Sequence, residues 1–354
     1  SYWIKRFARI MPLYWITLTA FFLLHREPQW QAPHYAIFYS LTQAFFFDIK
    51  WDALGVAWSL TVEESFYLLL PLLIVAIRYG ALGIERLVPA LRTRWTPVLV
   101  GLVVVFAASH VLWFLGSYLV REEITQFAGF MSNKDDMRTY TIFGRFADFA
   151  VGIVGGLAFL RTRNKILGAG WLADVAIVVS VVGILVLCRQ IYYEGGKWPG
   201  SDNLETKAGW RMNFYNAMLS GVIIYALCST RSTIAWALSW RPLQYLGEVS
   251  FAMYLLHFNA ISLKLYTFVR DMEWGLVASV AFVYGILTVA SALCYELIER
   301  PAQHLILEKA GVLQGSVRRP TALRLLGFAR RNRERRPRSG PPATGGAGQE
   351  PLAC

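Results

Sequence analysis

The stretch WSLTVEESFYLLLPLL, from Trp58 to Leu73, places two adjacent carboxylates at the head of a long apolar run. The apolar residues that follow Glu64 reach only to Ile77, which is shorter than the roughly 20 residues that a membrane-crossing helix needs. A span in this part of the chain therefore has to begin near Trp58 and to include both Glu63 and Glu64. Ionised residues inside a span are costly, so they usually face a cavity or a partner.

The composition of the whole chain agrees with a membrane protein. Of the 354 residues, 56% are hydrophobic and only 16% are charged, whereas about a quarter of the residues in a soluble domain are charged. A scan for apolar runs of about 20 residues predicts an all-α, polytopic transmembrane helical bundle. The eight predicted spans are Ile4–Leu24, Trp58–Ile77, Pro97–Leu119, Arg145–Leu160, Trp171–Cys188, Met212–Cys228, Tyr245–Tyr266 and Gly275–Ile298.

Charges in the predicted loops orient the bundle, because short cytoplasmic loops carry an excess of Lys and Arg. On one side of the predicted bundle the connections contain a single acid, Glu85, and many cations. The cations are Lys5, Arg6, Arg9, Arg78, Arg86, Arg92, Arg94, Arg161, Arg163, Lys165, Arg231 and Arg241. The alternate connections are mixed or acidic, as in the stretch from Glu122 to Arg138. We therefore expect a multi-pass protein of the inner (plasma) membrane with both ends of this chain on the cytoplasmic side.

The end of the chain has a different composition from the predicted bundle. Residues 306–354 are rich in Arg, Pro and Gly, which predicts a disordered basic tail after a transmembrane domain at residues 1–305. On the cytoplasmic side such a tail meets anionic lipid headgroups, each cation contributing about 1 kcal/mol near the surface. Charge alone is also compatible with nucleic-acid binding, but no RNA-binding or DNA-binding module accompanies the tail, so no nucleic-acid partner is predicted.

Glu63 and Tyr67 are four residues apart, so they share one face of the predicted helix. At 1.5 Å per residue, Glu63 lies about 8 Å inside a helix that starts at Trp58, which puts it near the outer boundary of the membrane. Glu64 points in another direction, about 100° away. Two interpretations stay open for Glu63, a functional carboxylate and an interfacial anchor that holds the helix end in water.

The stretch GEVSFAMYLLHF, from Gly247 to Phe258, carries a polar stripe on an apolar helix. Ser250, Tyr254 and His257 fall within about 60° of one another at the helical period. Imidazole can take a proton from a hydroxyl near neutral pH, and a Tyr or Ser can orient it. The alternative is a set of intramembrane hydrogen bonds that hold helices together.

The stretch KRFARIMPLYW, residues 5–15, places Arg6 and Arg9 three positions apart on one helix face. Two guanidinium groups with this spacing can bind a phosphate or a pyrophosphate through paired hydrogen bonds. The alternative is that both cations only satisfy the charge rule for cytoplasmic loops.

Together, five stretches resemble the signature blocks of the membrane acyltransferase-3 family, in the family's order. They are KRFARIMPLYW, WSLTVEESFYLLLPLL, GRFADFAVGIVGG, GEVSFAMYLLHF and YELIERP, and the resemblance extends from Tyr2 to Pro301. It implies an enzyme that moves an acyl group, often acetyl, from coenzyme A to hydroxyls of envelope polysaccharides or lipid-linked sugars. Acetyl-CoA or another acyl-CoA would be the donor substrate, with no permanently bound cofactor and no metal site.

The resemblance also implies roles for individual residues. In the family, the RxxR arginines are proposed to meet the coenzyme A phosphates, and the glutamate of the WSLxVE block and the polar positions of the SxxxYLLH block belong to the site. The positions that match here are Arg6, Arg9, Glu63, Arg145, Ser250, Tyr254, His257 and Glu299. The family core has two helices ahead of the first block, with its proposed catalytic His and an Arg. The resemblance thus implies a truncated chain and leaves the activity of this fragment open.

Two other classes of function fit the same residues. Intramembrane acids and histidines also mark substrate paths, so a transporter or flippase of a glycan precursor is the main alternative. An acyl-binding or assembly protein without turnover is the other.

Overall fold

The computed structural model describes residues 2–25, 30–93, 95–120, 127–162, 170–195, 207–228, 232–257, 260–272 and 274–312. Within these ranges the chain is helical, and the β-structure is limited to one isolated bridge between Phe46 and Phe130. The helices belong to one unit, Ser1–Ala310, and the second unit, Gly311–Cys354, lies almost wholly outside the described residues. The all-α prediction is confirmed. The predicted domain boundary after residue 305 falls inside the last helix, and the tail prediction concerns residues that are mostly not described.

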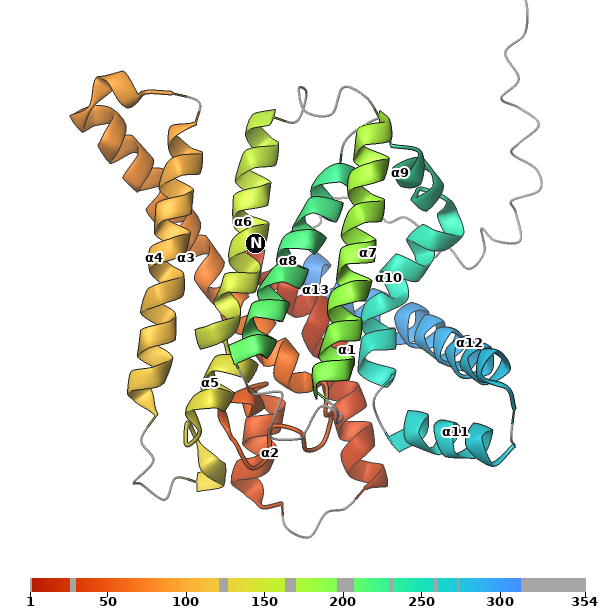
Figure 1. Cartoon of the computed structure of the whole chain (residues 1–354). Helices are drawn as coiled ribbons and strands as arrows, with labels where there is room; N and C mark the ends of the chain where they lie inside the picture. The colour runs from red at the N-terminus through yellow and green to blue at the C-terminus, as the bar shows by residue number, and fades with distance from the viewer. Residues whose placement is uncertain are drawn as a thin grey trace, which may run out of the picture. The chain divides into compact units, whose positions relative to one another are not determined.

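Six helical segments of the described chain are long and apolar enough to cross a membrane (Figure 1). They are α1 (Tyr2–Leu24), α3 (Ala57–Leu87), α4 (Thr96–Leu119), the pair α5 (Lys134–Tyr140) and α6 (Ile142–Thr162), α7 (Gly170–Gly195), and the rod formed by α12 (Leu276–Cys294), η4 (Tyr295–Glu299) and α13 (Arg300–Lys309). The apolar part of α8 (Lys207–Leu227) is shorter. The remaining elements are α2 (Ala32–Tyr39), η1 (Gln43–Phe45), η2 (Pro89–Leu91), η3 (Phe127–Gly129), α9 (Thr233–Leu238), α10 (Arg241–Leu256) and α11 (Ala260–Asp271).

The predicted span Tyr245–Tyr266 was wrong as a single helix. Helix α10 ends at Leu256, and α11 begins at Ala260. At the break, the Nδ1 atom of His257 lies 2.6 Å from the carbonyl oxygen of Tyr254, so a side chain meets one of the last carbonyls of α10. The apolar run of this segment is therefore divided between two short helices.

Two predicted spans extend further than their apolar runs. Helix α3 continues past the predicted end at Ile77 to Leu87. The charged residues after Ile77, which were predicted to lie in a loop, are part of this helix. The last predicted span, which was expected to end at Ile298, continues through η4 to Lys309. Pro301 occupies the first turn of α13, directly after the π-helical turn η4.

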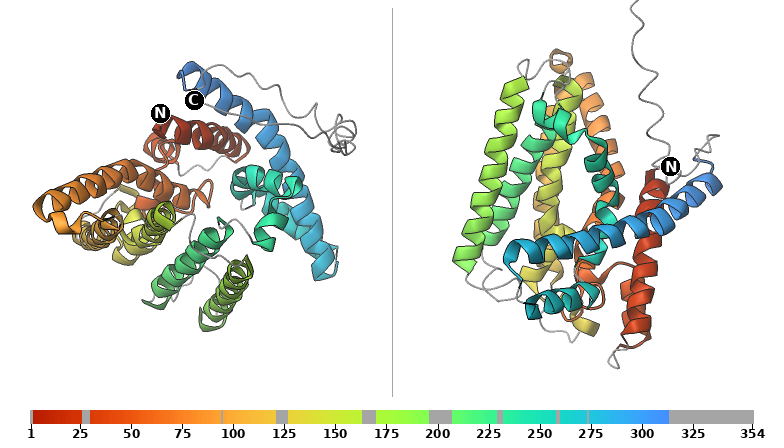
Figure 2. Two further views of the ribbon diagram at one scale, coloured as in Figure 1. Left: turned by 90° about the horizontal axis from the view of Figure 1, so that it is seen from above. Right: turned by 90° about the vertical axis from the view of Figure 1, so that its right-hand side faces the viewer.

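Helix α1 packs along both η4 and α13, and the right-hand view of Figure 2 shows the α12–α13 rod crossing α1. The buried side chains around α1 include Leu13, Tyr14 and Leu18, and they share one apolar core with Phe38 and with Leu255 of α10. The Tyr14 hydroxyl donates a hydrogen bond to the Phe38 carbonyl at 2.7 Å. This core fixes α1 beside the start of α3 and the end of α10, where the predicted site residues lie.

Candidate functional site

The first predicted cation, Arg6, lies against α3. Its guanidinium carbon is 4.7 Å from the centre of the Tyr67 ring, within the range of a cation–π contact. The Tyr67 hydroxyl in turn donates to the Glu63 carboxylate, at a long 3.4 Å. Arg6, Tyr67 and Glu63 therefore form one continuous polar cluster between α1 and α3, and all three side chains are half-buried.

The first residues of α1 complete this cluster. The Tyr2 ring meets the Tyr67 ring edge to face, with the centroids 6.4 Å apart, and the Arg6 guanidinium carbon is 5.8 Å from the Tyr2 centroid. The indole of Trp3 donates to the Tyr67 carbonyl at 3.1 Å. The aromatic rings hold Arg6 in place while its guanidinium N–H groups stay available to an anion.

The cluster differs from the expectation that Arg6 and Glu63 lie near opposite faces of the membrane. Tyr67, which contacts Arg6, is about 15 Å from the start of α3 and about 30 Å from its end, at 1.5 Å per residue. The N-terminal turns of α1 thus lie beside the first half of α3 and not beside its distal end. Helix α3 has 31 residues and α1 has 23, so α3 extends beyond the first turn of α1.

Two adjacent acids of α3 lie near the arginines of α1. The positive charges of Arg6 and Arg9 both act on Glu63, and that of Arg6 also acts on Glu64. Among the described residues, Glu64 Oε1 and the Tyr2 hydroxyl are buried without a hydrogen-bond partner. Buried polar atoms are nearly always paired, so a polar ligand beside Arg6 would satisfy these two atoms.

Only part of the predicted stripe on α10 joins α3. The Tyr254 hydroxyl contacts the Ser59 hydroxyl and donates to the Val56 carbonyl at 3.1 Å, near the start of α3. Ser250 is exposed and bonds to the Gly247 carbonyl of its own helix at 2.8 Å. His257 is exposed at the end of α10. Tyr254 therefore fixes the start of α3, whereas Ser250 lies apart from the cluster.

Arg145 lies outside the cluster, on another side of α3. It pairs with Asp148 at 2.9 Å, and its guanidinium carbon is 5.8 Å from the ring centre of Trp58. Trp58 is about 140° from Glu63 around the helix axis. It belongs to an aromatic group with Trp51 and Tyr140, whose centroids are 5.8 and 5.1 Å from it. The structure thus gives Arg145 a half-buried ion pair and an aromatic neighbour.

Glu299 lies at the end of η4 and is almost completely buried, with 2% of its surface exposed. Its Oε2 atom has no hydrogen-bond partner among the described residues. Because α1 packs on η4, this carboxylate lies near the same helix that carries Arg6 and Arg9.

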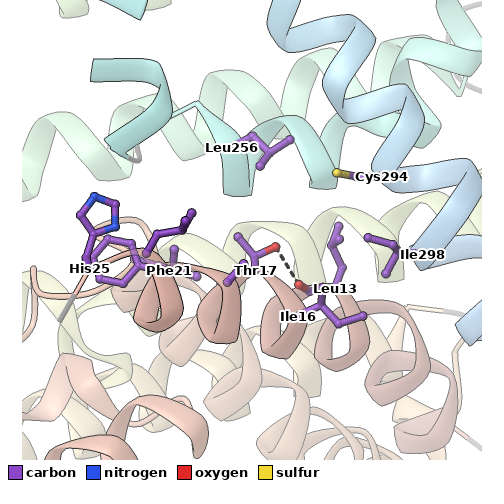
Figure 3. Close-up of a pocket in the computed structure, with 11 residues that line it drawn as sticks. Leu13, Ile16, Thr17, Phe21, His25, Leu256, Cys294 and Ile298 are labelled. Atoms are coloured by element: carbon purple, nitrogen blue, oxygen red, sulfur yellow. Dashed lines mark hydrogen bonds between the residues drawn. The ribbon is translucent and has the colours of Figure 1, made fainter. Parts of the chain in front are cut away.

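An apolar groove of about 210 Å³ lies between α1, α10 and η4 (Figure 3). Its walls include Leu13 and Ile16 on one side and Leu256, Cys294 and Ile298 on the other. The lining suits a hydrocarbon chain and contains no Arg or Lys that could bind a phosphate. At its end the ring of His25, which the sequence interpretation missed, stacks on Phe21 with the centroids 4.8 Å apart. A histidine at the end of an apolar helix was the available signal.

The sequence interpretation also missed a buried ion pair beside the start of α3. Lys50 and Asp136 contact each other with 6% and 1% of their surfaces exposed, although 86 positions separate them. Backbone bonds join the same two segments, from Met131 N–H to the Phe45 carbonyl at 2.8 Å and from Phe47 N–H to the Gly129 carbonyl at 3.1 Å. These contacts hold the segments before α3 and before α6 together.

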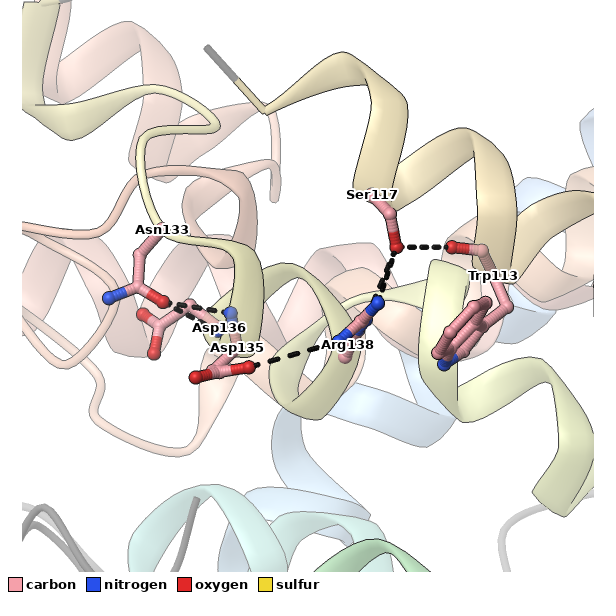
Figure 4. A network of polar contacts seen from close by, with 6 residues as sticks. All are labelled: Trp113, Ser117, Asn133, Asp135, Asp136 and Arg138. Atoms are coloured by element: carbon pink, nitrogen blue, oxygen red, sulfur yellow. Dashed lines mark hydrogen bonds and ion pairs between the residues drawn. The ribbon is translucent and has the colours of Figure 1, made fainter. Parts of the chain in front are cut away.

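Helix α5, which carries Asp136, is fixed at both ends (Figure 4). At its start, the Asn133 side chain accepts hydrogen bonds from the N–H groups of Asp135 and Asp136 at 2.9 and 3.0 Å, as an N-cap residue does. Near its end, Arg138 donates to the Ser117 hydroxyl at 2.9 Å and lies 4.1 Å from the Trp113 ring centre. These contacts attach α5 to α4 and so support the buried ion pair.

Six apolar helical segments in the described chain and a half-buried cluster of Arg6, Tyr67 and Glu63 between two of them are typical of a multi-pass membrane protein with a polar site. The chain belongs to the acyltransferase-3 family, because the family model described as an acyltransferase domain matches residues 1–296. It is thus a membrane acyltransferase in the general sense. Glu299 and Pro301 lie just beyond the matched residues. Comparisons with curated proteins and with solved structures gave no match.

Proposed function

We propose that the protein transfers an acyl group, acetyl in the simplest case, from acyl-coenzyme A to a hydroxyl of a cell-envelope glycan or a lipid-linked sugar. The observation that supports this proposal best is the contact of Arg6 with Tyr67 and, through it, with Glu63. A guanidinium, which is a group that can bind phosphate, thus lies next to a carboxylate, which is a group that can orient a hydroxyl. Both requirements of acyl transfer from a phosphorylated donor meet in one cluster.

The two arginines would share the recognition of the donor. Coenzyme A carries several phosphate charges, and arginine binds phosphate oxygens through paired N–H donors. Arg9 is exposed, whereas Arg6 is half-buried under Tyr67. Arg9 is thus the first to meet the phosphates, and Arg6 holds the part of the donor that enters the bundle.

Glu63 would act on the acceptor. In acyl transfer the hydroxyl oxygen attacks the thioester carbonyl, a C–O bond forms and the C–S bond breaks. The hydroxyl proton would pass through the Glu63 carboxylate to the departing coenzyme A thiolate, which leaves as the thiol. The Glu63 carboxylate accepts a hydrogen bond from Tyr67 and has further lone pairs with which to hold the acceptor hydroxyl. Tyr254 positions Glu63 by fixing the start of α3.

The proposal includes an orientation in the membrane. The predicted loops with excess Lys and Arg support an inner-membrane protein with both ends of this chain in the cytoplasm, where acyl-coenzyme A is available. The basic residues after 305 would meet anionic headgroups there.

Membrane vesicles that contain the full-length protein test the proposal. They are incubated with acetyl-coenzyme A labelled in the acetyl group and with candidate lipid-linked and polysaccharide acceptors. Label in the glycan supports the acyltransferase. Movement of the glycan across the membrane without label would instead support the transporter, and bound donor without transfer would support an acyl-binding protein.

A further inference from the structure

The most deeply buried carboxylate of the α12–α13 rod lies at an irregular point of the helix. Glu299 is the last residue of η4, a π-helical turn, and the helix is regular on both sides of it. π-helical turns are rare in proteins, and those that occur often lie at functional sites. The extra residue rotates the side chains that follow by about 100° relative to the regular helix. Without it, Glu299 would present its carboxylate in another direction.

The partner of Glu299 lies on α1. Helix α1 packs against η4 and α13, and the two helices cross in the right-hand view of Figure 2. Arg9 lies one helical turn before Leu13, which lines the apolar groove together with Ile298, the residue before Glu299. Arg9 is therefore on the face of α1 that is turned towards η4, and its charge acts on Glu299. A carboxylate with 2% exposure and an unmatched Oε2 atom is costly inside a membrane bundle unless a cation or a ligand compensates it. Arg9 offsets part of that cost.

The other acids near η4 have different partners. Glu296 accepts from Arg300 at 3.0 Å, and Glu248 of α10 accepts from the Tyr295 hydroxyl at 3.1 Å. Both of these acids therefore have hydrogen-bond partners other than Arg9.

We propose that Glu299 is a positioning residue, which holds the exposed Arg9 side chain against the bundle so that its guanidinium faces the donor phosphates together with Arg6. This inference rests on the proposed function. An exposed arginine loses rotamer freedom when it binds an anion, and a fixed carboxylate behind it reduces that loss in advance. The two arginines then have separate supports, the Tyr67 ring for Arg6 and the Glu299 carboxylate for Arg9.

A double-mutant cycle on the full-length protein tests the pair. The wild type, Glu299→Gln, Arg9→Ala and the double variant are compared by their dissociation constants for coenzyme A and by their thermal unfolding temperatures in detergent. Glu299→Gln is nearly isosteric, and Glu299→Asp serves as a second variant that keeps the charge. Glu308→Gln is the control, because it removes an exposed carboxylate from the same rod.

Glu299→Gln is expected to weaken coenzyme A binding about fivefold when Arg9 is present and to have no effect when Arg9 is absent. The kcat at saturating donor should not change, and Glu299→Asp should fall between Gln and the wild type. Equal effects in both backgrounds, no effect at all, or tighter binding in Glu299→Gln would overturn the inference.

If the wild type itself binds no coenzyme A, the proposed function fails, and the unfolding temperatures test the contact of Glu299 with Arg9 independently. Non-additive unfolding temperatures would then support this contact, and additive ones would rule it out.

Discussion

The guanidinium carbon of Arg6 lies 4.7 Å from the centre of the Tyr67 ring. This contact joins the first helix of the chain to α3 and links a cation, through Tyr67, to the Glu63 carboxylate, which accepts a hydrogen bond from the Tyr67 hydroxyl. Each part of the proposed acyl transfer depends on it, because it connects the group that would bind the donor to the group that would hold the acceptor.

Substitutions of Tyr67 separate its two contacts. Tyr67→Phe keeps the ring beneath Arg6 and removes the hydroxyl that donates to Glu63, so coenzyme A affinity should stay close to that of the wild type while the transfer rate falls about tenfold. Tyr67→Leu removes both contacts and should weaken donor binding as well. Labelled-acetyl transfer and coenzyme A binding measure the two effects, and identical behaviour of the two variants would contradict the assignment.

Glu63→Gln should reduce kcat by about a hundredfold, because an amide neither accepts a proton nor attracts a hydroxyl as a carboxylate does. The KM for the donor should change little. Glu85→Gln removes a carboxylate from the far end of the same helix and serves as the control. Transfer at the wild-type rate by well-folded Glu63→Gln protein would reduce Glu63 to an anchor at the helix end.

The buried pair of Lys50 with Asp136 should be essential for stability. Removal of one partner leaves a buried charge uncompensated, so Asp136→Ala should destabilise the protein by about 3–5 kcal/mol. Replacement of both residues, as in Lys50→Met with Asp136→Leu, should restore most of the loss, since two apolar side chains leave no charge unpaired. Thermal unfolding in detergent measures both proteins, and a mild Asp136→Ala variant would show that water reaches the pair.

Two glycines of α6 should respond to alanine in opposite directions. A Cβ atom on Gly144 would lie 1.8 Å from the Arg138 carbonyl oxygen, whereas one on Gly152 would have no neighbour within 4 Å. Gly144→Ala should therefore separate α6 from α5 and lower the unfolding temperature. Gly152→Ala should raise stability by about 0.4–1 kcal/mol through the unfolded state. The same sign for both variants would contradict the close contact at Gly144.

The local features of the site could be predicted from the sequence, because they depend on short spacings. Arg6 and Arg9 are three apart, Glu63 and Tyr67 are four apart, and helical geometry fixes their shared faces. The apolar runs likewise predicted most of the spans. Glu63 was predicted as a site candidate because the span could not be completed without it.

The remaining features depend on how helices pack, which spacing does not determine. The position along α3 that contacts α1 depends on the length of α3. The sequence prediction ended this helix at Ile77, because charged residues follow, whereas the helix continues to Leu87. The break after Leu256 follows from a local contact of His257 with the Tyr254 carbonyl. Lys50 and Asp136 were assigned to different loops, and only the folded chain brings them together.

Direct binding of coenzyme A to the purified protein tests the central claim, that the arginines of α1 form the donor site. The wild type should bind, and Arg6→Ala and Arg9→Ala should each weaken binding about tenfold or more, as expected when a charge-assisted hydrogen bond is lost. Arg86→Ala, at the far end of α3, should bind as the wild type does. Equal affinities in all four proteins would contradict the account.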